Sequence, residues 1–338
     1  MRSIVTTANG DVRVMKVQER PDPVTGKAEV LVRVKAAGLN FADILARQGL
    51  YPDGPPKPCV MGYEVSGLVE SVGDGVDPNW IGKPVIAMTR FNGQAELVAV
   101  PSTQVFEKPD SLTFEEAAAI PVNYLTAWAL LVTMGGLKKG EAVLIHNAGG
   151  GVGLAALDIA KHIGATTYGT ASASKHSFLK QRGLDYAIDY RNQDWLPVLM
   201  DLTSGRGVEL VIDPLGGNNW KKSYRALRAT GRMGMFGMSV ASASGIRGKL
   251  RALKAVAQMP RFNPLALINR NRSVFGLNLG HMWGEGEKVA AWTQEIMRGV
   301  AEGWIRPHVD RTFPFDQIAN AHRCLEERKN IGKVVLTP

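Results

Sequence analysis

Cysteine is scarce in this chain: among its 338 residues only Cys59 and Cys324 are present, far apart in the sequence. Two isolated cysteines exclude a disulfide framework, and without a C-x-x-C pair they exclude a cysteine-rich zinc site. The six histidines also lack the tight spacing of metal ligands, which favours surface or core positions for them. We therefore expect no bound metal and a reducing compartment.

Targeting and membrane-spanning segments are also lacking. The first eleven residues contain no long apolar run of the kind a signal peptide needs, and Asp11 comes early for a transit peptide. The uncharged run from Ala117 to Leu137 is long enough to cross a bilayer, but Pro121 and Asn123 interrupt it. The same composition is typical of a helix buried between two domains. We expect a cytoplasmic protein without a membrane span.

Acidic residues are absent from residues 241–272, although seven lysines and arginines lie there. The formal net charge of the whole chain is +9, so the remainder is nearly neutral. Within this segment we predict an amphipathic helix over 246–260, ended by Pro260. Its apolar face consists of Ile246, Leu250, Leu253 and Ala257, and its basic face of Arg247, Arg251 and Lys254.

Three interpretations of the 246–260 helix stay open, one of which is a helix that covers a cleft for anionic ligands. The other two differ in what the apolar face contacts. One is a solvated surface helix packed on its own domain. The other is a weak, reversible contact with an anionic membrane, because the charge suits the interface and the small apolar face allows little insertion. Nucleic acid is not expected as a partner, since no aromatic residues interleave with the basic ones.

What the sequence does contain is a strand, a glycine cluster and a helix in immediate succession over residues 142–161. Such a turn presents backbone N–H groups and a helix N-terminus to a pyrophosphate. The match to the G-x-G-x-x-G fingerprint is imperfect, because Ala148 occupies the place of its first glycine. We assign the pyrophosphate of a dinucleotide to the residues Gly150, Gly151, Val152 and Gly153.

The pattern of the chain changes near residue 123. The preceding residues form short β-prone segments separated by glycine and proline, which is typical of an irregular, partly antiparallel β domain. From residue 124 strand-like and helix-like segments alternate, which predicts a parallel, doubly wound α/β sheet. Its strands are expected at 142–147, 166–171, 186–190, 209–214, 231–237 and 273–279.

The tail from residue 280 shows one helix-like segment, 287–303, and a last strand, 332–336. It is too short to fold alone, so we expect it to return to the first domain. The predicted division is therefore 1–123 and 280–338 for the β domain, and 124–279 for the α/β domain.

Several motifs carry a resemblance to a known family. They are Asn40–Tyr51, Gly62–Gly73, Ala117–Ala127, the glycine cluster at Gly150 and Gly332–Leu336, in one order along nearly the whole chain. Together they resemble the zinc-independent, zeta-crystallin-like quinone oxidoreductases of the medium-chain dehydrogenase/reductase superfamily. Further segments resemble the vesicle amine transport protein subgroup: Gly169–His176, Asp213–Gly217, Ile305–Asp310 and Lys329–Lys333.

The resemblance implies a GroES-like, mainly β catalytic domain, a Rossmann-like coenzyme domain and a dimer through the last strand of the Rossmann-like sheet, here 273–279. It also implies hydride transfer from NADPH to a quinone-like acceptor. Reduction of the activated double bond of an enone is the alternative, since both reactions deliver hydride to an electron-poor centre. A third interpretation is a nucleotide-holding protein at a membrane surface with little turnover.

Asn40 and Tyr51 are the candidate catalytic residues, because the resemblance places them near the nicotinamide and the acceptor. An amide and a phenol can hydrogen-bond an acceptor oxygen as it gains charge. Asn40 also suits the start of a helix, and Tyr51 a loop. In zinc-dependent relatives a Cys and a His occupy the places of Asn40 and Tyr63. Asp43 and Arg47, one helical turn apart, are expected to form an i,i+4 ion pair.

NADPH is expected rather than NADH, because the second strand of the α/β domain ends without the acid that an NAD site places there. The first acid downstream is Asp185. Ser172, Lys175 and Tyr190 instead offer a hydroxyl, a cation and a phenol, and the resemblance assigns them to the 2′-phosphate. Further cofactor contacts are assigned to Asn40, Thr126, Gly237, Met238, Ser239, Gly276, Asn278 and Lys333.

Overall fold

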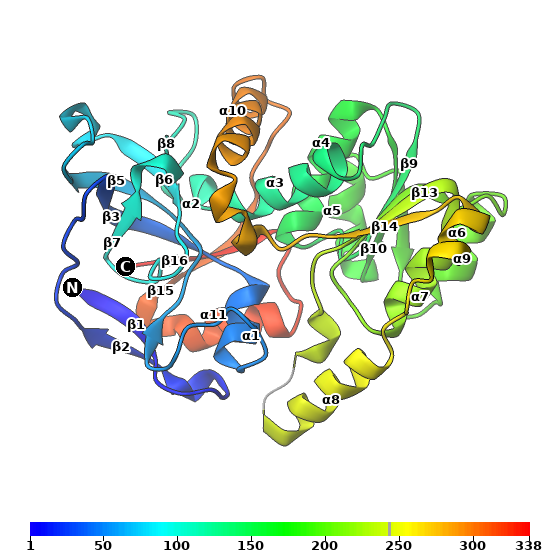
Figure 1. Ribbon diagram of the computed structural model, residues 1–338, viewed down its shortest axis with the longest axis horizontal. Coiled ribbons are helices and arrows are strands. Elements are labelled where there is room, and N and C mark those ends of the chain that lie inside the picture. The colour runs from blue at the N-terminus through cyan, green and yellow to red at the C-terminus, as the bar shows by residue number, and fades with distance from the viewer. Residues whose placement is uncertain (243–244) are drawn as a thin grey trace. The chain divides into compact units, whose positions relative to one another are not determined.

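The chain divides into two compact units, seen in a computed structural model that describes residues 1–242 and 245–338 (Figure 1). Unit 1 comprises Met1–Leu125, Gly280–Gly303 and Pro307–Pro338. Unit 2 comprises Thr126–Leu279 together with Trp304–Arg306. Each unit is built around its own β-sheet.

Unit 2 contains a six-stranded parallel sheet with the order β11-β10-β9-β12-β13-β14. Its strands are β9 (Ala142–Ile145), β10 (Thr166–Ala171), β11 (Tyr186–Asp189), β12 (Val208–Asp213), β13 (Leu227–Met235) and β14 (Ser273–Gly276). The order reverses between β9 and β12, which is the switch point at which doubly wound sheets bind ligands. The predicted α/β fold class is confirmed, although several strands end one to three residues earlier than expected.

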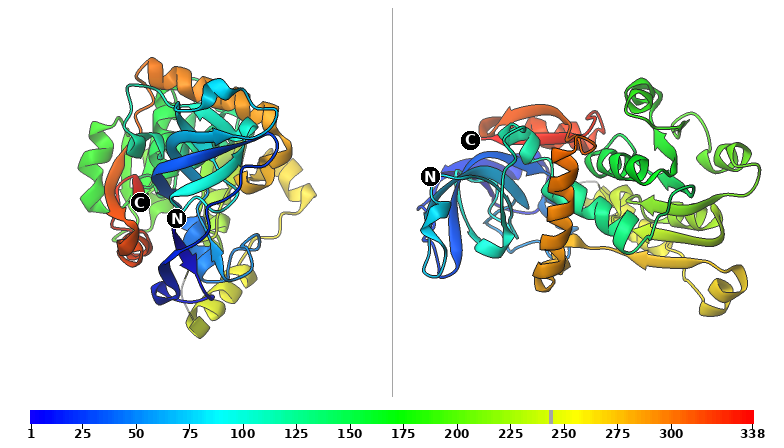
Figure 2. Two further views of the ribbon diagram at one scale, coloured as in Figure 1. Left: turned by 90° about the vertical axis from the view of Figure 1, so that its left-hand side faces the viewer. Right: turned by 90° about the horizontal axis from the view of Figure 1, so that it is seen from above.

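Helices cover both faces of this sheet (Figure 2). They are α4 (Gly151–Ile163), α5 (His176–Gln181), α6 (Trp195–Leu202), α7 (Asn218–Arg225), α8 (Gly245–Ala257) and α9 (Pro264–Arg270). Because both faces are covered, the central strands consist of buried apolar residues rather than alternating ones. Leu144, Val211 and Met233 belong to the resulting core. This rigid sheet fixes the positions of the loops at its carboxyl edge.

Unit 1 contains a seven-stranded sheet with the order β15-β16-β3-β5-β6-β8, in which β7 also pairs with β3. The long strand β3 (Glu29–Leu39) pairs with β7 through its first half and with β16 through its last residues. The other strands are β5 (Glu64–Val72), β6 (Pro84–Met88), β7 (Leu97–Pro101), β8 (Val105–Glu107), β15 (Val309–Pro314) and β16 (Lys333–Thr337). A second sheet joins β1 (Arg2–Thr6), β2 (Met15–Glu19) and β4 (Cys59–Val60).

The helices of unit 1 lie against these sheets (Figure 1). They are α1 (Phe41–Arg47), α2 (Phe114–Ala117), α10 (Gly286–Ala301) and α11 (Ile318–Glu326), and α3 (Pro121–Trp128) runs across the division between the units. The tail contains more secondary structure than expected, because β15 and α11 lie between α10 and the last strand, β16.

The uncharged run 117–137 contains the end of α2, the helix α3, which begins at Pro121, and a π-helical turn over Ala129–Thr133. In the part of the chain that the structure describes, no helix has the length and hydropathy needed to span a bilayer.

Candidate cofactor and acceptor sites

The turn between β9 and α4 presents an open helix N-terminus. Gly150 stands before the helix without a capping side chain, and the first turn contains no acid. A Cβ on Gly153 would lie 2.4 Å from the Asn147 oxygen and 2.6 Å from the Ala148 oxygen, so only glycine fits there. The backbone N–H groups and the dipole of α4 are thus available to a pyrophosphate.

The imperfect glycine fingerprint has a physical reason in this turn. The left-handed residue is Asn147, with φ of 54°, and not Ala148. Asparagine tolerates this conformation better than most residues with a Cβ. Ala148 is buried, and its N–H donates to the backbone carbonyl oxygen of Thr170 at 3.1 Å. Alanine therefore fits where the fingerprint has its first glycine.

Ser172 and Lys175 follow β10 directly, and each is only 8% exposed. The Lys175 side chain lies across the glycine turn, because a Cβ on Gly149 would be 2.8 Å from Lys175 Cδ. Ala171 pairs with Asp189, so Ser172 and Tyr190 leave adjacent strand ends. The structure therefore brings Ser172, Lys175 and Tyr190 to the edge where the turn lies, and a solvated Lys175 is excluded.

The remaining predicted cofactor contacts of unit 2 lie at a strand end, on loops or in a helix. Ser239 N–H donates to the Pro214 oxygen at 3.0 Å, so the loop of Gly237, Met238 and Ser239 docks on the loop after β12. Gly276 ends β14, and Asn278 follows two residues later. Thr126 differs from these loop residues, because it is buried in α3.

Asn40 lies in unit 1 within a buried polar cluster, between β3 and α1. Its Oδ1 accepts a hydrogen bond from Lys333 Nζ at 2.7 Å, and its Nδ2 donates to Glu64 Oε1 at 2.8 Å. Lys333 Nζ also bonds directly to Glu64 Oε1, and Val122 N–H donates to Glu64 Oε2 at 2.7 Å. The amide of Asn40 is thereby held in one orientation, and Lys333 reaches it from β16. Asn40 is also the N-cap residue of α1, where it forms a capping box with Asp43, as the start-of-helix interpretation expected.

The expected Asp43–Arg47 ion pair is wrong. Asp43 Oδ2 accepts from Asn40 N–H at 2.8 Å, and its Oδ1 accepts from Gly62 N–H at 3.1 Å. Burial raises the pKa of Asp43 to about 7, although these hydrogen bonds and Lys333 act in the opposite direction. Arg47 points elsewhere, toward α11, as described next.

The Arg47 guanidinium, which is almost fully buried, bonds to partners far along the chain. Its Nη1 lies 3.0 Å from His322 Nδ1, and its Nη2 bonds to Glu326 Oε1. Tertiary partners on α11 have therefore replaced the local one.

Glu64 and Asp43 both lie beside Asn40, but the sequence did not predict either of them as a site residue.

Tyr51 lies in an aromatic group with Tyr63 and Phe91. The Tyr51 and Tyr63 rings meet edge to face at 6.2 Å, and the Tyr63 and Phe91 centroids lie 5.5 Å apart. The Tyr63 hydroxyl is buried and has no hydrogen-bond partner among the described residues. Burial raises the pKa of Tyr63, so this phenol stays a proton donor at neutral pH.

The positions of the potential metal-ligating side chains bear on the question of a metal site. Over residues 1–242 and 245–338 as described, no three His, Cys, Asp or Glu side chains come together as a metal-binding group. The donor set around Asn40 consists of an amide, a carboxylate and an ammonium, and an ammonium does not ligate a cation. These residues do not fit a zinc ion.

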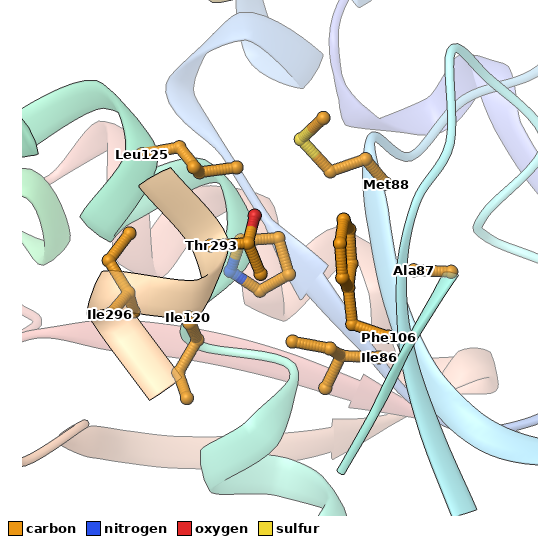
Figure 3. A pocket seen from close by; sticks show the side chains of 9 residues that line it. Ile86, Ala87, Met88, Phe106, Ile120, Leu125, Thr293 and Ile296 are labelled. Atoms are coloured by element: carbon orange, nitrogen blue, oxygen red, sulfur yellow. The ribbon is translucent and has the colours of Figure 1, made fainter. Parts of the chain in front are cut away.

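A small apolar cavity in unit 1 does not involve the predicted residues (Figure 3). It lies between β6, β8, α3 and α10 and offers about 10 Å³, roughly the space of one water molecule. Thr293 is its polar side chain, but the Thr293 hydroxyl already donates to the Val289 oxygen at 2.8 Å. The other lining residues are Ile86, Ala87, Met88, Phe106, Ile120, Pro121, Leu125 and Ile296. A space of this size holds no substrate.

Comparisons with known proteins place the chain in a family. Residues 26–110 match the alcohol dehydrogenase GroES-like domain, and residues 182–336 match the zinc-binding dehydrogenase family. The chain is 41% identical to the synaptic vesicle membrane protein VAT-1 homolog of Rattus norvegicus, over all of this chain and 84% of that protein. The chain belongs to the VAT-1 homologue family. The resemblance to the zinc-independent branch of the medium-chain dehydrogenase/reductase superfamily is thereby confirmed.

Solved structures of other members of the superfamily share the fold of this VAT-1 homologue. A mycobacterial protein solved with NADPH has a TM-score of 0.88 and 31% identity, and covers both chains completely. The Escherichia coli quinone oxidoreductase solved with NADPH has a TM-score of 0.88 and 28% identity, again over both complete chains. The CurK enoyl reductase has a TM-score of 0.85 and 27% identity over 99% of each chain.

Proposed function

We propose that this VAT-1 homologue is an NADPH-dependent, zinc-independent oxidoreductase that transfers a hydride to a quinone-like acceptor. The observation that carries the proposal is the turn after β9, where Lys175 lies across the glycines beside an uncapped helix N-terminus. This arrangement suits a pyrophosphate and an additional phosphate. Two similar structures, one of them a quinone oxidoreductase, contain NADPH, which supports the assignment.

The two acids at the ends of β11 are engaged by other groups. Asp185 accepts from Lys161 Nζ at 2.9 Å and from Thr167 N–H at 2.8 Å, at the amino ends of β10 and β11. Asp189 accepts from Arg191 N–H at 3.0 Å and from Asn192 Nδ2 at 2.6 Å. Neither carboxylate takes the role of the acid that binds the ribose hydroxyls in an NAD site. With Lys175 beside the turn instead, the site favours a 2′-phosphate over a free ribose hydroxyl.

The proposed acceptor site consists of Asn40 and Tyr51. NADPH supplies the hydride when bound, and the acceptor oxygen gains negative charge as the carbon framework is reduced. Asn40 is pre-oriented by Lys333 and Glu64, so its amide needs little reorganisation to meet that charge. Lys333 adds a buried positive charge next to the amide, and Tyr51 offers a phenol proton.

Reduction of an activated double bond is the alternative activity. It is supported by the similarity to the CurK enoyl reductase and by 36% identity, over 91% of this chain, to a subunit of a mycobacterial polyketide synthase. That subunit is much longer, since the match covers 13% of it. Hydride delivery to an enone places the developing charge on the same kind of carbonyl oxygen, so the proposed roles of Asn40 and Tyr51 stay the same.

Steady-state oxidation of NADPH with matched quinones and enones tests the proposal. We expect turnover with quinones, and a loss of turnover in Asn40→Ala that exceeds its loss of NADPH affinity. Turnover with enones alone would establish the alternative. Tight binding of NADPH without turnover of any acceptor would instead support a nucleotide-holding role.

We also propose that α8 and α9 contact an anionic membrane surface. Five large apolar side chains on these helices face solvent: Leu250 at 60%, Leu253 at 67%, Val256 at 51%, Leu265 at 69% and Ile268 at 68% exposure. In Figure 1, α8 extends away from the sheet of its unit. The exposed leucines of α8 do not support the interpretation of a helix whose apolar face packs on its own domain.

The charge of α8 and α9 supports an anionic surface as the partner of these helices. The exposed cations Arg251, Lys254, Arg261 and Arg270 accompany the apolar side chains, and no acid occurs between 241 and 272. An interfacial helix needs both an apolar face and basic flanks. Flotation with anionic vesicles is expected to recover the protein, whereas neutral vesicles are not. Leu250→Ser with Leu253→Ser should abolish recovery, whereas Leu202→Ser, an exposed leucine on α6, should not.

A further inference from the structure

The imidazole of His146 is enclosed at the junction of β9 and the glycine turn. It is 1% exposed, and its ring meets the Trp195 ring edge to face at 4.6 Å. His146 Nδ1 lies 3.0 Å from Thr170 Oγ1, and His146 Nε2 lies 3.1 Å from Ser223 Oγ. Both ring nitrogens therefore have a polar partner inside unit 2.

The proton positions follow from the carboxylate at one end of this network. Asp213 accepts from Leu215 N–H at 2.7 Å, from Asn219 Nδ2 at 2.8 Å and from the Ser223 hydroxyl at 2.6 Å. Since the Ser223 hydroxyl has one proton and gives it to Asp213, its oxygen must accept from His146. His146 therefore carries its proton on Nε2.

The other end of the network is the dinucleotide turn. Burial lowers the pKa of His146, so the neutral ring leaves Nδ1 free to accept the proton of the Thr170 hydroxyl. The hydroxyl oxygen of Thr170, Oγ1, then accepts from the N–H of Asn147 at 3.3 Å. Asn147 is the residue of the turn that holds the left-handed φ of 54°.

We propose that Thr170, His146, Ser223 and Asp213 are positioning residues that hold the dinucleotide turn at Asn147. All hydrogen bonds run in one direction, from the turn to the carboxylate that also anchors Leu215 in the loop after β12. The network thus couples two loops at the carboxyl edge where the order of the sheet reverses. This role rests on the proposed cofactor site.

Ser223 does not act as a nucleophile in this arrangement. Its side chain is completely buried, and its proton goes to Asp213 and not to the histidine. A serine nucleophile requires the opposite direction, in which the imidazole removes the hydroxyl proton. The network therefore supports a conformation and carries out no chemistry of its own.

Thr170→Val tests the role, because valine keeps the shape of threonine and removes the hydroxyl. Without the hydrogen bond from Asn147 N–H to the Thr170 hydroxyl, the turn spends less time in the conformation that binds the cofactor. The Kd for NADPH should therefore rise about 2- to 12-fold. Thr170→Ser keeps the hydroxyl and should restore native affinity. Thr167→Val is the matched control, because the Thr167 hydroxyl is also buried in β10 but bonds to Asp185. It should lower stability and leave the Kd unchanged.

A second measurement needs no cofactor: ¹⁵N chemical shifts of the His146 ring in the native protein should show the Nε2–H tautomer. An Nδ1–H tautomer, a native Kd in Thr170→Val, or an equal rise of Kd in Thr167→Val would each overturn the role. If the native chain does not bind NADPH at all, the proposed cofactor fails and this role with it. Native binding that Thr170→Val leaves unaffected refutes the positioning role alone.

Discussion

The buried charges around Asn40 orient the amide more than they stabilise unit 1. Removing a carboxylate and an ammonium from water costs several kcal/mol for each ion, which their attraction offsets only when the remaining hydrogen bonds are made. Here they are made, since Glu64 accepts bonds from Lys333, Asn40 and the Val122 N–H. Each of these groups depends on the others, so changing one leaves another unpaired.

Lys333→Met should lower the free energy of unfolding by about 3–5 kcal/mol, because it leaves the Glu64 carboxylate buried without its cation. Denaturant unfolding measures this change. The double variant Lys333→Met with Glu64→Gln removes both charges and should recover much of the loss. A single variant as stable as the native protein would contradict a buried ion pair.

Lys175→Ala should weaken NADPH binding about 10- to 150-fold, since a charge-assisted contact contributes roughly 1.5–3 kcal/mol. NADH binding should stay nearly unchanged, because NADH has no 2′-phosphate. Fluorescence titration with both cofactors provides the comparison. Lys180→Ala, an exposed lysine in α5, is the control and should alter neither affinity. Equal losses for NADPH and NADH would contradict the assignment of Lys175.

Asp43 should make stability depend on pH near neutrality. Burial raises the pKa of Asp43 in the folded protein to about 7, from an ordinary value of 3.8. The folded state therefore binds more protons than the unfolded state between these two values, and stability falls as pH rises from about 4 to 7. The stability difference between native protein and Asp43→Asn should shrink over this range and level off above it. A pH-independent difference would show that Asp43 is ionised throughout.

At the scale of elements, the turn packs closely on the start of α4, because a Cβ on Gly153 would meet the backbone oxygens of Asn147 and Ala148. Gly153→Ala places a Cβ against two backbone oxygens that cannot move aside as a flexible side chain would. We expect a loss of about 1–3 kcal/mol in stability from such overpacking. Gly276→Ala is the matched control, because its Cβ would have one neighbour, at 3.9 Å. Thermal unfolding without cofactor should separate the two variants.

The strands of unit 2 could be predicted because buried parallel strands appear as short apolar runs between helical patterns. The helix α11 was missed because it is short and half polar, although Ile318, Ala321 and Cys324 follow one buried face. The i, i+3, i+6 spacing of these three residues is a helical signal for α11. The strand β1 gave no such signal, because its buried positions do not alternate with exposed ones.

The polar cluster of unit 1 could not be predicted from local patterns. Lys333 lies 293 residues from Asn40 along the chain, and only the pairing of β16 with β3 brings them together. The same holds for Arg47, whose partners on α11 lie 275 and 279 residues away. The i,i+4 rule describes an isolated helix, and a buried guanidinium selects tertiary acceptors instead.

At the scale of the whole molecule, the surface of unit 2 has two features that need a partner. One is the apolar and basic surface of α8 and α9, for which we propose a membrane. The other is β14, the last strand of its sheet, which pairs with β13 on one side only within the described residues. An exposed strand edge presents unpaired N–H and C=O groups, which favours pairing with another chain.

We expect a dimer through β14, with the mass of two 36.6 kDa chains in light scattering at micromolar concentration. Leu277 N–H donates to the Met235 oxygen, so by alternation the N–H of Val274 points away from β13 and toward the partner strand. Val274→Pro removes that N–H and should give monomers. Val274→Ala loses similar packing against the core but keeps the N–H, so it should remain dimeric. Monomers in the native protein, or dimers in both variants, would show that β14 is not the interface.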